Sequence, residues 1–377
     1  MKLYHRSFLL ALLAFPACCQ TIPFPGPGGV AASWPNGYAH RQLFTFNVHP
    51  NSDLSAFPNL ISGTYPQLAD TAHGGYVNQT VALNGQTVPA DLIFTSDSVG
   101  STLLSWEIES WSNTTGAIVA WVKDDRSSSA DTLIYAWVGK VGVTSYQCSA
   151  TATWTDYLGV WHFPNGSTLS LNDSTAASNT MTQSSYGSLY PPTAMAGKVD
   201  GAWGTTFVNE YRATAGTSTS AMGNGDSLTI SAWIYVHSST GDEAGLLNVG
   251  QAAYPYYNVE IDLFADGTTA GSVEGVVSPS SSALSLGAWH HVVVVYDGSN
   301  VSYYIDGNSV GTTSIGAHSA IISNPLYMNT NPHQAAGDVN YDEVRVSGSV
   351  HSAAWIAHEY LQQSQANAWF TVASWAP

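Results

Sequence analysis

Short, largely apolar stretches recur along the first part of the chain, separated by turn residues. The stretches are rich in valine, isoleucine, tryptophan and threonine and are bounded by turn residues, so they predict strands. We expect these strands at residues 43–48, 91–95, 103–109, 117–123 and 132–138. Their spacing is typical of a β-sandwich.

The second part of the chain repeats this pattern after a polar stretch. We expect its strands at residues 157–163, 228–236, 258–264, 289–296 and 301–305. The Asp-Gly pairs at 297–298 and 306–307 provide the positive φ that hairpin turns require, so the last strands should pair antiparallel. One helix is expected at 353–363, with Ser352 as its N-cap. The fold class is therefore all-β, with two β-sandwich modules.

The N-terminus has the pattern of an export signal. Lys2, His5 and Arg6 precede an apolar run over residues 8–15, which small residues follow. We therefore interpret residues 1–20 as a signal peptide. Seven Pro and Gly-rich residues at 23–29 cannot hold a regular element, so 21–30 reads as a linker.

These features divide the remaining chain into two domains. We expect the N-terminal β-sandwich at 31–150 and the second domain at 157–370, joined through a polar stretch. No later apolar stretch reaches the roughly 20 residues of a transmembrane helix. The sequence therefore predicts a secreted protein or one at the extracellular surface, without a transmembrane segment.

The charge and cysteine content limit the classes of partner and the kinds of cross-link that the protein can have. Lys and Arg number 9 against 26 Asp and Glu, and the formal net charge is −17. Such a surface repels nucleic acid, so we expect no nucleic-acid partner. Of the three cysteines, Cys18 and Cys19 fall within the signal, which leaves Cys148 without an internal disulfide partner. Lipid anchoring through Cys18 or Cys19 is the alternative to plain secretion, although Phe-Pro-Ala is a poor sequence before a lipidated cysteine.

Three segments of the second part carry a resemblance to a known superfamily. They are GDSLTISAWIYV at 225–236, LGAWHHVVVVYDGSNVSYYIDGNSVG at 286–311 and YDEVRVSG at 341–348. Together they resemble the concanavalin A-like lectin and glucanase superfamily, with its laminin-G-like modules, which implies a concanavalin-like jelly roll. The first part, with ADLIFTSDSVGSTLLSWEIESW at 90–111, resembles a bacterial domain of unknown function that precedes such modules.

Glu260 and Asp262 form the sharpest catalytic candidate. The resembled β-glucanases have Glu-Ile-Asp on a strand with a second Glu four or five positions later, and retaining hydrolysis needs two carboxylates about 5 to 5.5 Å apart. Here the later positions are Phe264 and Ala265, so the acid/base is missing. We therefore assign no catalytic residue and keep a divergent glycoside hydrolase using Glu260 and Asp262 as the alternative. Whether the chain is an enzyme stays open, and we favour the answer that it is not.

The resemblance also implies a structural calcium ion. In the resembled sandwiches an Asp on the last strand helps to hold calcium, and this position corresponds to Asp342, with Asp173 as the early partner. Calcium takes six to eight oxygen ligands, so carbonyl groups around residues 197–201 would complete the shell. The alternative is that Asp342 only caps a turn.

For a carbohydrate-binding surface the sequence offers aromatic and amide residues in two expected loops. They are Tyr254, Tyr256, Tyr257, Asn331 and His333. Aromatic faces stack on sugar rings and amides bind hydroxyl groups. The alternative is that they are ordinary loop residues. The leading hypothesis is a secreted carbohydrate- or glycoprotein-binding, adhesion-type protein whose partner is an extracellular glycan or glycoprotein; a structural cell-surface component is a further alternative.

Overall fold

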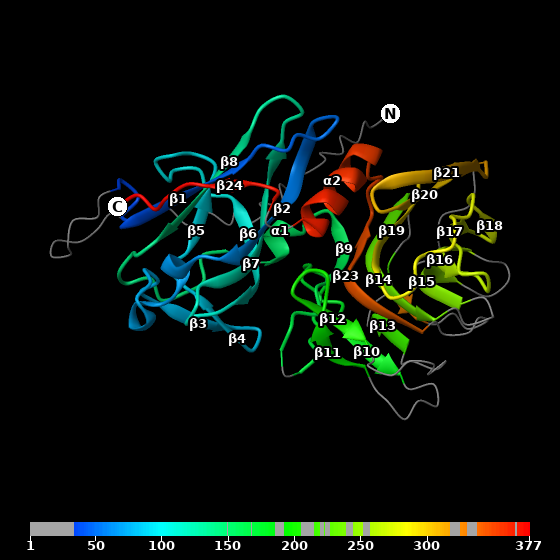
Figure 1. Ribbon diagram of the computed structural model, residues 1–377, viewed down its shortest axis with the longest axis horizontal. Helices are drawn as coiled ribbons and strands as arrows, with labels where there is room; N and C mark the ends of the chain where they lie inside the picture. Colours follow the sequence, from blue (N-terminus) through cyan, green and yellow to red (C-terminus); the bar gives the residue numbers. More distant parts are fainter. Residues whose placement is uncertain are drawn as a thin grey trace, which may run out of the picture.

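A computed structural model describes residues 34–148, 150–166, 168–184, 192–204, 215–218, 222, 227–238, 244–251, 257–316, 325–329, 338–365 and 368–377. The chain forms two β-modules that lie side by side, with helix α2 (Ala353–Ser364) between them (Figure 1). The expected signal peptide at 1–20 and linker at 21–30 lie outside the described residues.

The first module is a sandwich of two antiparallel sheets. One sheet has the order β24-β1-β8-β5 and the other β2-β7-β6, and a hairpin of β3 and β4 lies beside them. The strands are β1 (His40–Phe46), β2 (Leu54–Thr64), β3 (Thr80–Leu83), β4 (Gln86–Pro89), β5 (Ile93–Thr95), β6 (Ser105–Trp111), β7 (Ala117–Arg126), β8 (Thr132–Val138) and β24 (Thr371–Val372). Two 3-10 turns, η1 (Pro66–Leu68) and η2 (Thr71–His73), connect β2 to β3. The expected strands of this module are confirmed within a few residues.

The core of the first module follows from the alternation in its strands. Phe44 and Phe46 of β1, Trp106 and Ile108 of β6 and Ile134 of β8 are almost fully buried in one apolar cluster. Burial of such side chains contributes about 1.5–3 kcal/mol each. Their neighbours in sequence point to the opposite face, which on β6 and β7 is turned to the second module.

The second module is a larger sandwich of a seven-stranded and an eight-stranded sheet, consistent with the expected all-β class. The first has the order β10-β13-β22-β15-β16-β17-β18, and the second β11-β12-β23-β14-β19-β20-β21, with β9 paired to β23. The strands are β9 (Tyr157–Trp161), β10 (Met181–Ser184), β11 (Thr193–Ala196), β12 (Gly201–Gly204), β13 (Ala215–Ser218), β14 (Leu228–Ser238), β15 (Ala244–Gln251), β16 (Tyr257–Leu263), β17 (Thr269–Val273), β18 (Val276–Val277), β19 (Trp289–Tyr296), β20 (Asn300–Ile305), β21 (Asn308–Ser314), β22 (Leu326–Met328) and β23 (Asp338–Ser347).

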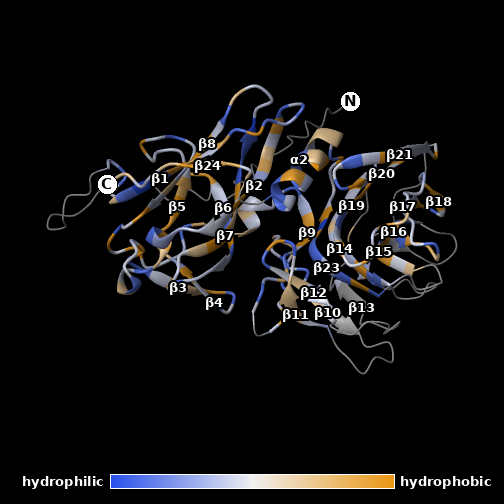
Figure 2. Cartoon of the chain, viewed as in Figure 1, coloured by the Kyte–Doolittle hydropathy of each residue, from blue (hydrophilic) through white to orange (hydrophobic). Residues whose placement is uncertain are grey.

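Both expected hairpins of the second module are present. β19 pairs antiparallel with β20, and β20 with β21. At the second turn Asp306 and Gly307 have φ of 50° and 74°, as an Asp-Gly turn requires. Apolar residues run along the strands of both modules (Figure 2), and in the second they fill the space between the two sheets.

Two features join the modules. A short helix, α1 (Ala150–Thr153), leads into Trp154, which packs with Trp121 of β7, Tyr157 and Val160 in an apolar cluster between them. After α2 the chain returns to the first module, where β24 pairs with β1 (Figure 1). The last described residues therefore add to the first module, although the expected second domain extends to residue 370.

Helix α2 begins as expected, with the Ser352 hydroxyl accepting a hydrogen bond from the N–H of Trp355 at 3.1 Å. Its buried side chains include polar ones, Glu359, Gln362 and Gln363. These residues bind groups of both modules, which explains why a helix with a weak apolar stripe is nevertheless covered.

Candidate functional site

A cleft of about 620 Å³ lies where the first module meets the loop that follows β9. Its walls come from the β3–β4 hairpin, the end of β6 and residues 164–166 and 168–172. The polar side chains that line it are amides and hydroxyls: Asn84, Gln86, Thr87, Ser110, Asn113, Asn165, Thr168, Ser170 and Asn172. Trp111 is the aromatic residue among them, and none of the described lining residues is charged. Groups of this kind bind neutral, hydroxyl-rich ligands.

Hydrogen bonds fix the first-module wall of the cleft. The indole N–H of Trp111 donates to the carbonyl of Leu68 at 2.9 Å, which sets the plane of the half-buried ring. The side-chain amide of Asn113 donates to Asp70 at 2.9 Å. In the turn between β3 and β4, Asn84 adopts the left-handed backbone conformation, with φ of 50°. These hydrogen bonds orient Trp111 and Asn113 without the help of a ligand.

The second-module wall is held by two aspartates. Asp200 Oδ2 accepts the backbone N–H of Asn165 at 3.0 Å. Asp173 Oδ1 accepts the N–H groups of Val160 and Thr175, both at 2.9 Å, and its Oδ2 accepts the Thr175 hydroxyl at 2.7 Å and the Asn179 N–H at 2.7 Å. Four donors occupy the Asp173 carboxylate, so this expected calcium ligand acts as a loop anchor beside the cleft.

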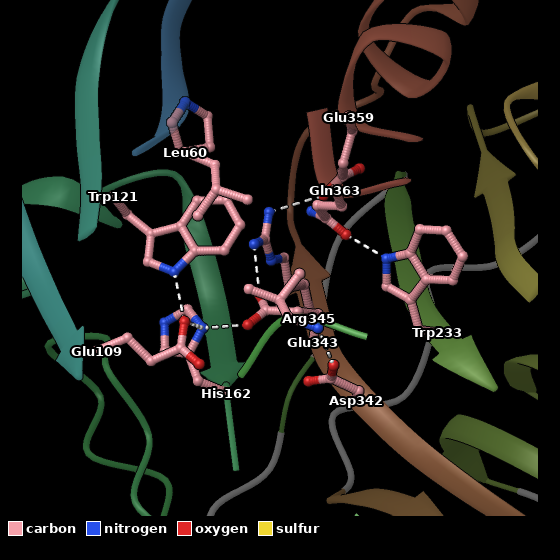
Figure 3. A network of polar contacts seen from close by, with 12 residues as sticks. Leu60, Glu109, Trp121, His162, Trp233, Asp342, Glu343, Arg345, Glu359 and Gln363 are labelled. Carbon is pink, nitrogen blue, oxygen red and sulfur yellow. Dashed lines mark hydrogen bonds and ion pairs between the residues drawn. The ribbon is translucent and has the colours of Figure 1, made fainter. Parts of the chain in front are cut away.

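A buried cluster of ionisable groups lies between the modules (Figure 3). Glu107 and Glu109 come from β6, His162 follows β9, Glu343 and Arg345 come from β23 and Glu359 from α2. His162 Nδ1 lies 2.7 Å from Glu343 Oε1 and 3.6 Å from Glu109 Oε2, while its Nε2 lies 3.2 Å from Glu107 Oε2. Arg345 binds Glu343 at 2.5 Å and Glu359 at 2.8 Å.

Two backbone irregularities direct the carboxylates to this place. The register of β6 on β7 shifts between Ile108 and Ser110, which makes Glu109 the extra residue of a bulge. The register of β14 on β23 also shifts, and Glu343 has a φ of 51° there. A bulge re-aims a side chain, so two strands of different modules point carboxylates at one histidine.

The charges of the cluster set its protonation. Although burial would lower it, Glu343, Glu107 and Glu109 raise the pKa of His162 well above its ordinary value. Burial, and then the charge of Glu343, raise the pKa of Glu109 well above the usual range. Burial opposes ionisation of Glu343 too, but His162 and Arg345 outweigh it and hold its pKa below the ordinary value.

Aromatic rings enclose the cluster. The Trp121 ring stacks on His162 at 5.7 Å and its N–H donates to Glu109 at 2.8 Å. The guanidinium of Arg345 lies 4.3 Å from the Trp121 ring centroid and 4.8 Å from that of Trp154. Such a low-dielectric surrounding strengthens each ionic contact and makes an uncompensated charge costly.

Glu260 and Asp262, the candidate carboxylates, lie on β16 with their side chains directed away from the apolar core. Glu260 accepts from Asn248 at 2.6 Å, Asn258 at 2.9 Å and the Ser272 hydroxyl at 2.9 Å. The same hydroxyl lies 3.3 Å from Asp262. The two carboxylates thus share one face, as the alternation of the strand predicts, within a network of neutral donors.

Asp342, the other expected calcium ligand, is fully buried on β23. Its Oδ2 accepts the N–H groups of Lys198 and Val199, both at 2.7 Å, so the 197–201 loop offers this oxygen N–H groups, whereas the expected calcium shell requires carbonyl groups. Its Oδ1 has no hydrogen-bond partner among the described residues. Burial, and then Glu343, raise the pKa of Asp342 well above the usual range. One oxygen of Asp342 is therefore available to a cation, whereas Asp173 is saturated.

The expected sugar-binding residues are not described. Tyr254, Tyr256, Asn331 and His333 lie outside the described residues, and so does the side chain of Tyr257. Sequence reasoning missed both the cleft and the ion cluster. Acidic residues at 107 and 109 alternate with buried Trp106 and Ile108. From the sequence alone, this pattern predicts that the acidic face of the strand is exposed to solvent, whereas in the structure the second module covers it.

Comparisons with known proteins address the second module. Residues 209–357 match the model of the concanavalin A-like lectin/glucanases superfamily, in agreement with the resemblance of this part. The proposed relationship of the first part to a bacterial domain of unknown function stays a prediction. No curated protein matches the chain. Within the described residues no helix has the length and apolar character needed to cross a bilayer.

Several solved structures resemble this fold at low identity. Domain 4 of the extracellular GH43 arabinanase AbnA from Geobacillus stearothermophilus, in complex with arabinotriose, is 16% identical over 54% of this chain and 97% of that chain, with a TM-score of 0.41. The binding domain of Paraclostridial Mosquitocidal Protein 1 is 13% identical over 55% of this chain and 52% of that chain, with a TM-score of 0.41. The botulinum neurotoxin type G receptor binding domain is 14% identical over 55% and 51%, with a TM-score of 0.40.

Proposed function

We propose that the protein is a secreted carbohydrate- or glycoprotein-binding, adhesion-type protein that holds a neutral glycan in the cleft between its modules. The observation that carries this proposal is the lining of the cleft, where a fixed Trp111 ring borders amides and hydroxyls without a charged group among the described lining residues. Amides donate and accept toward sugar hydroxyls, and an aromatic face packs on the C–H face of a sugar ring.

Preorganisation supports the same proposal. Asp200 binds the backbone N–H of Asn165 near the start of the loop, and Asp173, which follows the loop, binds the N–H of Val160, so little ordering is required when a ligand enters. A volume of about 620 Å³ falls within the range of small-molecule sites, which is about 300–1,000 Å³. The pattern of residues 1–20 favours export, and an extracellular glycan is the partner that this location offers.

We propose binding without hydrolysis. Glycoside cleavage needs one ionised carboxylate and one that donates a proton. Glu260 accepts three neutral donors and shares Ser272 with Asp262, which is the environment of a fixed structural acceptor. The cleft itself offers no carboxylate among its described lining residues. A divergent glycoside hydrolase and a structural surface component remain the competing functions.

A glycan array on the secreted protein, followed by calorimetry on the best ligand, tests the proposal. Trp111→Ala should weaken binding about tenfold or more, a change of about 1.4 kcal/mol, whereas Trp111→Phe should keep most of the affinity because the ring remains. Asn172→Ala, an exposed change in the opposite wall, should weaken binding without affecting folding.

Asn51→Ala provides the matched control, since Asn51 is also exposed and lies outside the cleft lining. Glycan binding that both cleft variants leave intact would place the ligand elsewhere, and the absence of binding to any glycan would favour the structural component. Release of reducing ends from β-glucans, galactans or chitin-type oligosaccharides would favour the glycoside hydrolase alternative.

A further inference from the structure

The centre of the ion cluster holds three groups that can ligate a metal. Glu109, His162 and Glu343 each present one donor atom, and these atoms lie within 4.8 Å of one another. All three side chains are buried, with at most 4% of any of them exposed. Metal–ligand bonds of about 2.0–2.2 Å separate neighbouring donors by roughly 3.3 Å. The observed separations from His162 Nδ1, 2.7 Å and 3.6 Å, lie on either side of that value.

The hydrogen bonds of Glu107 determine how His162 is oriented. Glu107 Oε1 accepts the hydroxyl of Ser174 at 2.7 Å, and its Oε2 accepts the indole N–H of Trp154 at 2.5 Å. A carboxylate that accepts from these donors also accepts from His162 Nε2, so Nε2 carries a proton. Nδ1 then faces the carboxylates of Glu343 and Glu109. A bare nitrogen lone pair there would be repelled by both, so either a proton or a metal cation lies between them.

A metal also supplies positive charge that the neighbouring groups lack when Glu109 is ionised as a ligand. Glu107, Glu109, Glu343 and Glu359 are then buried carboxylates, whereas the cationic groups beside them are Arg345 and, if doubly protonated, His162. A buried charge without a counter-charge costs several kcal/mol. A divalent cation at Nδ1 supplies one more positive charge than a proton does.

The surroundings of the three groups also fit a metal centre. Glu109 Oε1 is buried without a hydrogen-bond partner among the described residues and can act as a second ligand oxygen from the same carboxylate. Arg345 holds the outer oxygen of Glu343, and Trp121 holds Glu109. Metal-bound histidines characteristically donate their other N–H to a carboxylate, as His162 does to Glu107.

We propose that Glu109, His162 and Glu343 bind one divalent transition-metal cation that ties the two modules together. An imidazole nitrogen with carboxylate oxygens suits zinc, manganese or cobalt. Calcium takes oxygen ligands only, so this centre is distinct from the calcium expected at Asp342. Because the ligands are buried, the metal enters during folding and its binding contributes to the stability of the junction.

Refolding with a cobalt probe tests the proposal. The full chain is unfolded with chelator, refolded with Co²⁺ or Zn²⁺, and passed through gel filtration before metal analysis and visible spectroscopy. We expect about one Co²⁺ per chain with visible absorption bands, and loss of both in Glu109→Gln, which retains the acceptor for Trp121. Glu107→Gln should weaken binding about 10–100-fold, because it replaces the carboxylate partner of Nε2 by a weaker, neutral acceptor and leaves the three ligands in place.

Two controls separate this centre from its neighbours. Glu359→Gln changes an equally buried carboxylate that binds Arg345 but is not a ligand, and Asp342→Asn changes the expected calcium ligand. Both variants should retain Co²⁺. A wild-type chain that refolds to its native circular dichroism without retained metal would overturn the proposal and leave a proton on Nδ1. Equal metal in the wild type and in folded Glu109→Gln would overturn it as well.

Discussion

Gln362 of helix α2 accepts a hydrogen bond from the backbone N–H of Leu60 at 3.0 Å, across the boundary between the modules. Its side-chain nitrogen donates to the carbonyl of Pro58 at 2.9 Å. Strand β2 is at the edge of its sheet, so one glutamine amide satisfies backbone groups that another strand would otherwise bind. The next residue, Gln363, accepts from the indole of Trp233 in the second module. Helix α2 thus bonds to both modules.

Gln362→Ala should lower the free energy of unfolding by about 1–3 kcal/mol, because it leaves the buried N–H of Leu60 without a partner. Denaturant titration followed by circular dichroism measures this change. Gln365→Ala is the control, since Gln365 is exposed at the end of the same helix, and it should stay within about 0.5 kcal/mol of the wild type. Equal effects of the two substitutions would contradict the role assigned to Gln362.

Phe370→Ala should destabilise the first module by about 3–5 kcal/mol, although the residue lies near the end of the chain. Its ring packs on Phe44 at 5.5 Å and on Phe46 at 5.1 Å. Because the junction joins the modules, we expect calorimetry to show one transition that moves as a whole. Val372→Ala, at a position 38% exposed, should have little effect. Two transitions of which only one moves would show that the modules unfold independently.

Local pattern was sufficient to predict the strands and helix α2, since alternation and capping are properties of short segments. The ion cluster could not be predicted in this way. Glu109 and Glu343 meet because two bulges and the docking of two modules bring distant strands together. For both strands, polar residues on one face predict exposure to solvent, and only the packing of the two modules shows that these faces are covered. Asp342 binds the N–H of Lys198 in the 197–201 loop, but its assignment as a calcium ligand came from the resemblance and stays a prediction.

The pair of His290 and Asp306 should make stability depend on pH. The hydrogen bond to Asp306 raises the pKa of His290. Burial opposes ionisation of Asp306, but His290 and the N–H of His291 hold its pKa below the ordinary value. The contribution of His290 is present below its unfolded pKa and is lost as pH rises through its raised folded pKa. That of Asp306 is present above its unfolded pKa and is lost as pH falls through its lowered folded pKa.

The pair should therefore stabilise most between about pH 4 and pH 6.5, and by no more than about 1 kcal/mol, since both groups are partly exposed. Denaturant titrations at about pH 5.5 and about pH 8.5 give the free energy of unfolding before and after the contribution of His290 is lost. Asp306→Asn keeps a residue that tolerates its φ of 50° and should reduce the pH difference. If Asp306→Asn leaves the difference in unfolding free energy between the two pH values unchanged, other groups cause that difference.

Calcium at Asp342 should be detectable by chelation. A ligand at a hundredfold excess over its Kd stabilises by about 2.7 kcal/mol, so the melting temperature should fall when a calcium-selective chelator is added. Asp342→Asn should abolish this response. Asp173→Asn should lower the melting temperature without changing the response, because Asp173 is occupied by four hydrogen-bond donors. A melting temperature insensitive to chelator would count against the calcium ion.

Glu260→Gln should destabilise the second module by about 1–3 kcal/mol. The carboxylate receives amide N–H groups of Asn248 and Asn258 and a hydroxyl from Ser272, and all three are donors to it. Glutamine has one acceptor oxygen and an NH₂ group, so if that oxygen accepts from both Asn amides, the Ser272 hydroxyl loses this carboxylate acceptor and faces the NH₂ group instead, at a position only 8% exposed. Thermal unfolding measures the loss.

Asp262→Asn, beside it on the same strand face, is the matched control. The Ser272 hydroxyl lies farther from Asp262, at 3.3 Å, than from Glu260, at 2.9 Å, so substitution of Asp262 should cost less than that of Glu260. Glycan binding in the cleft should survive both changes, because the carboxylates do not line it. If the wild type releases reducing ends from any β-glucan, and Glu260→Gln abolishes this while remaining folded, Glu260 is a catalytic carboxylate and binding without hydrolysis is wrong.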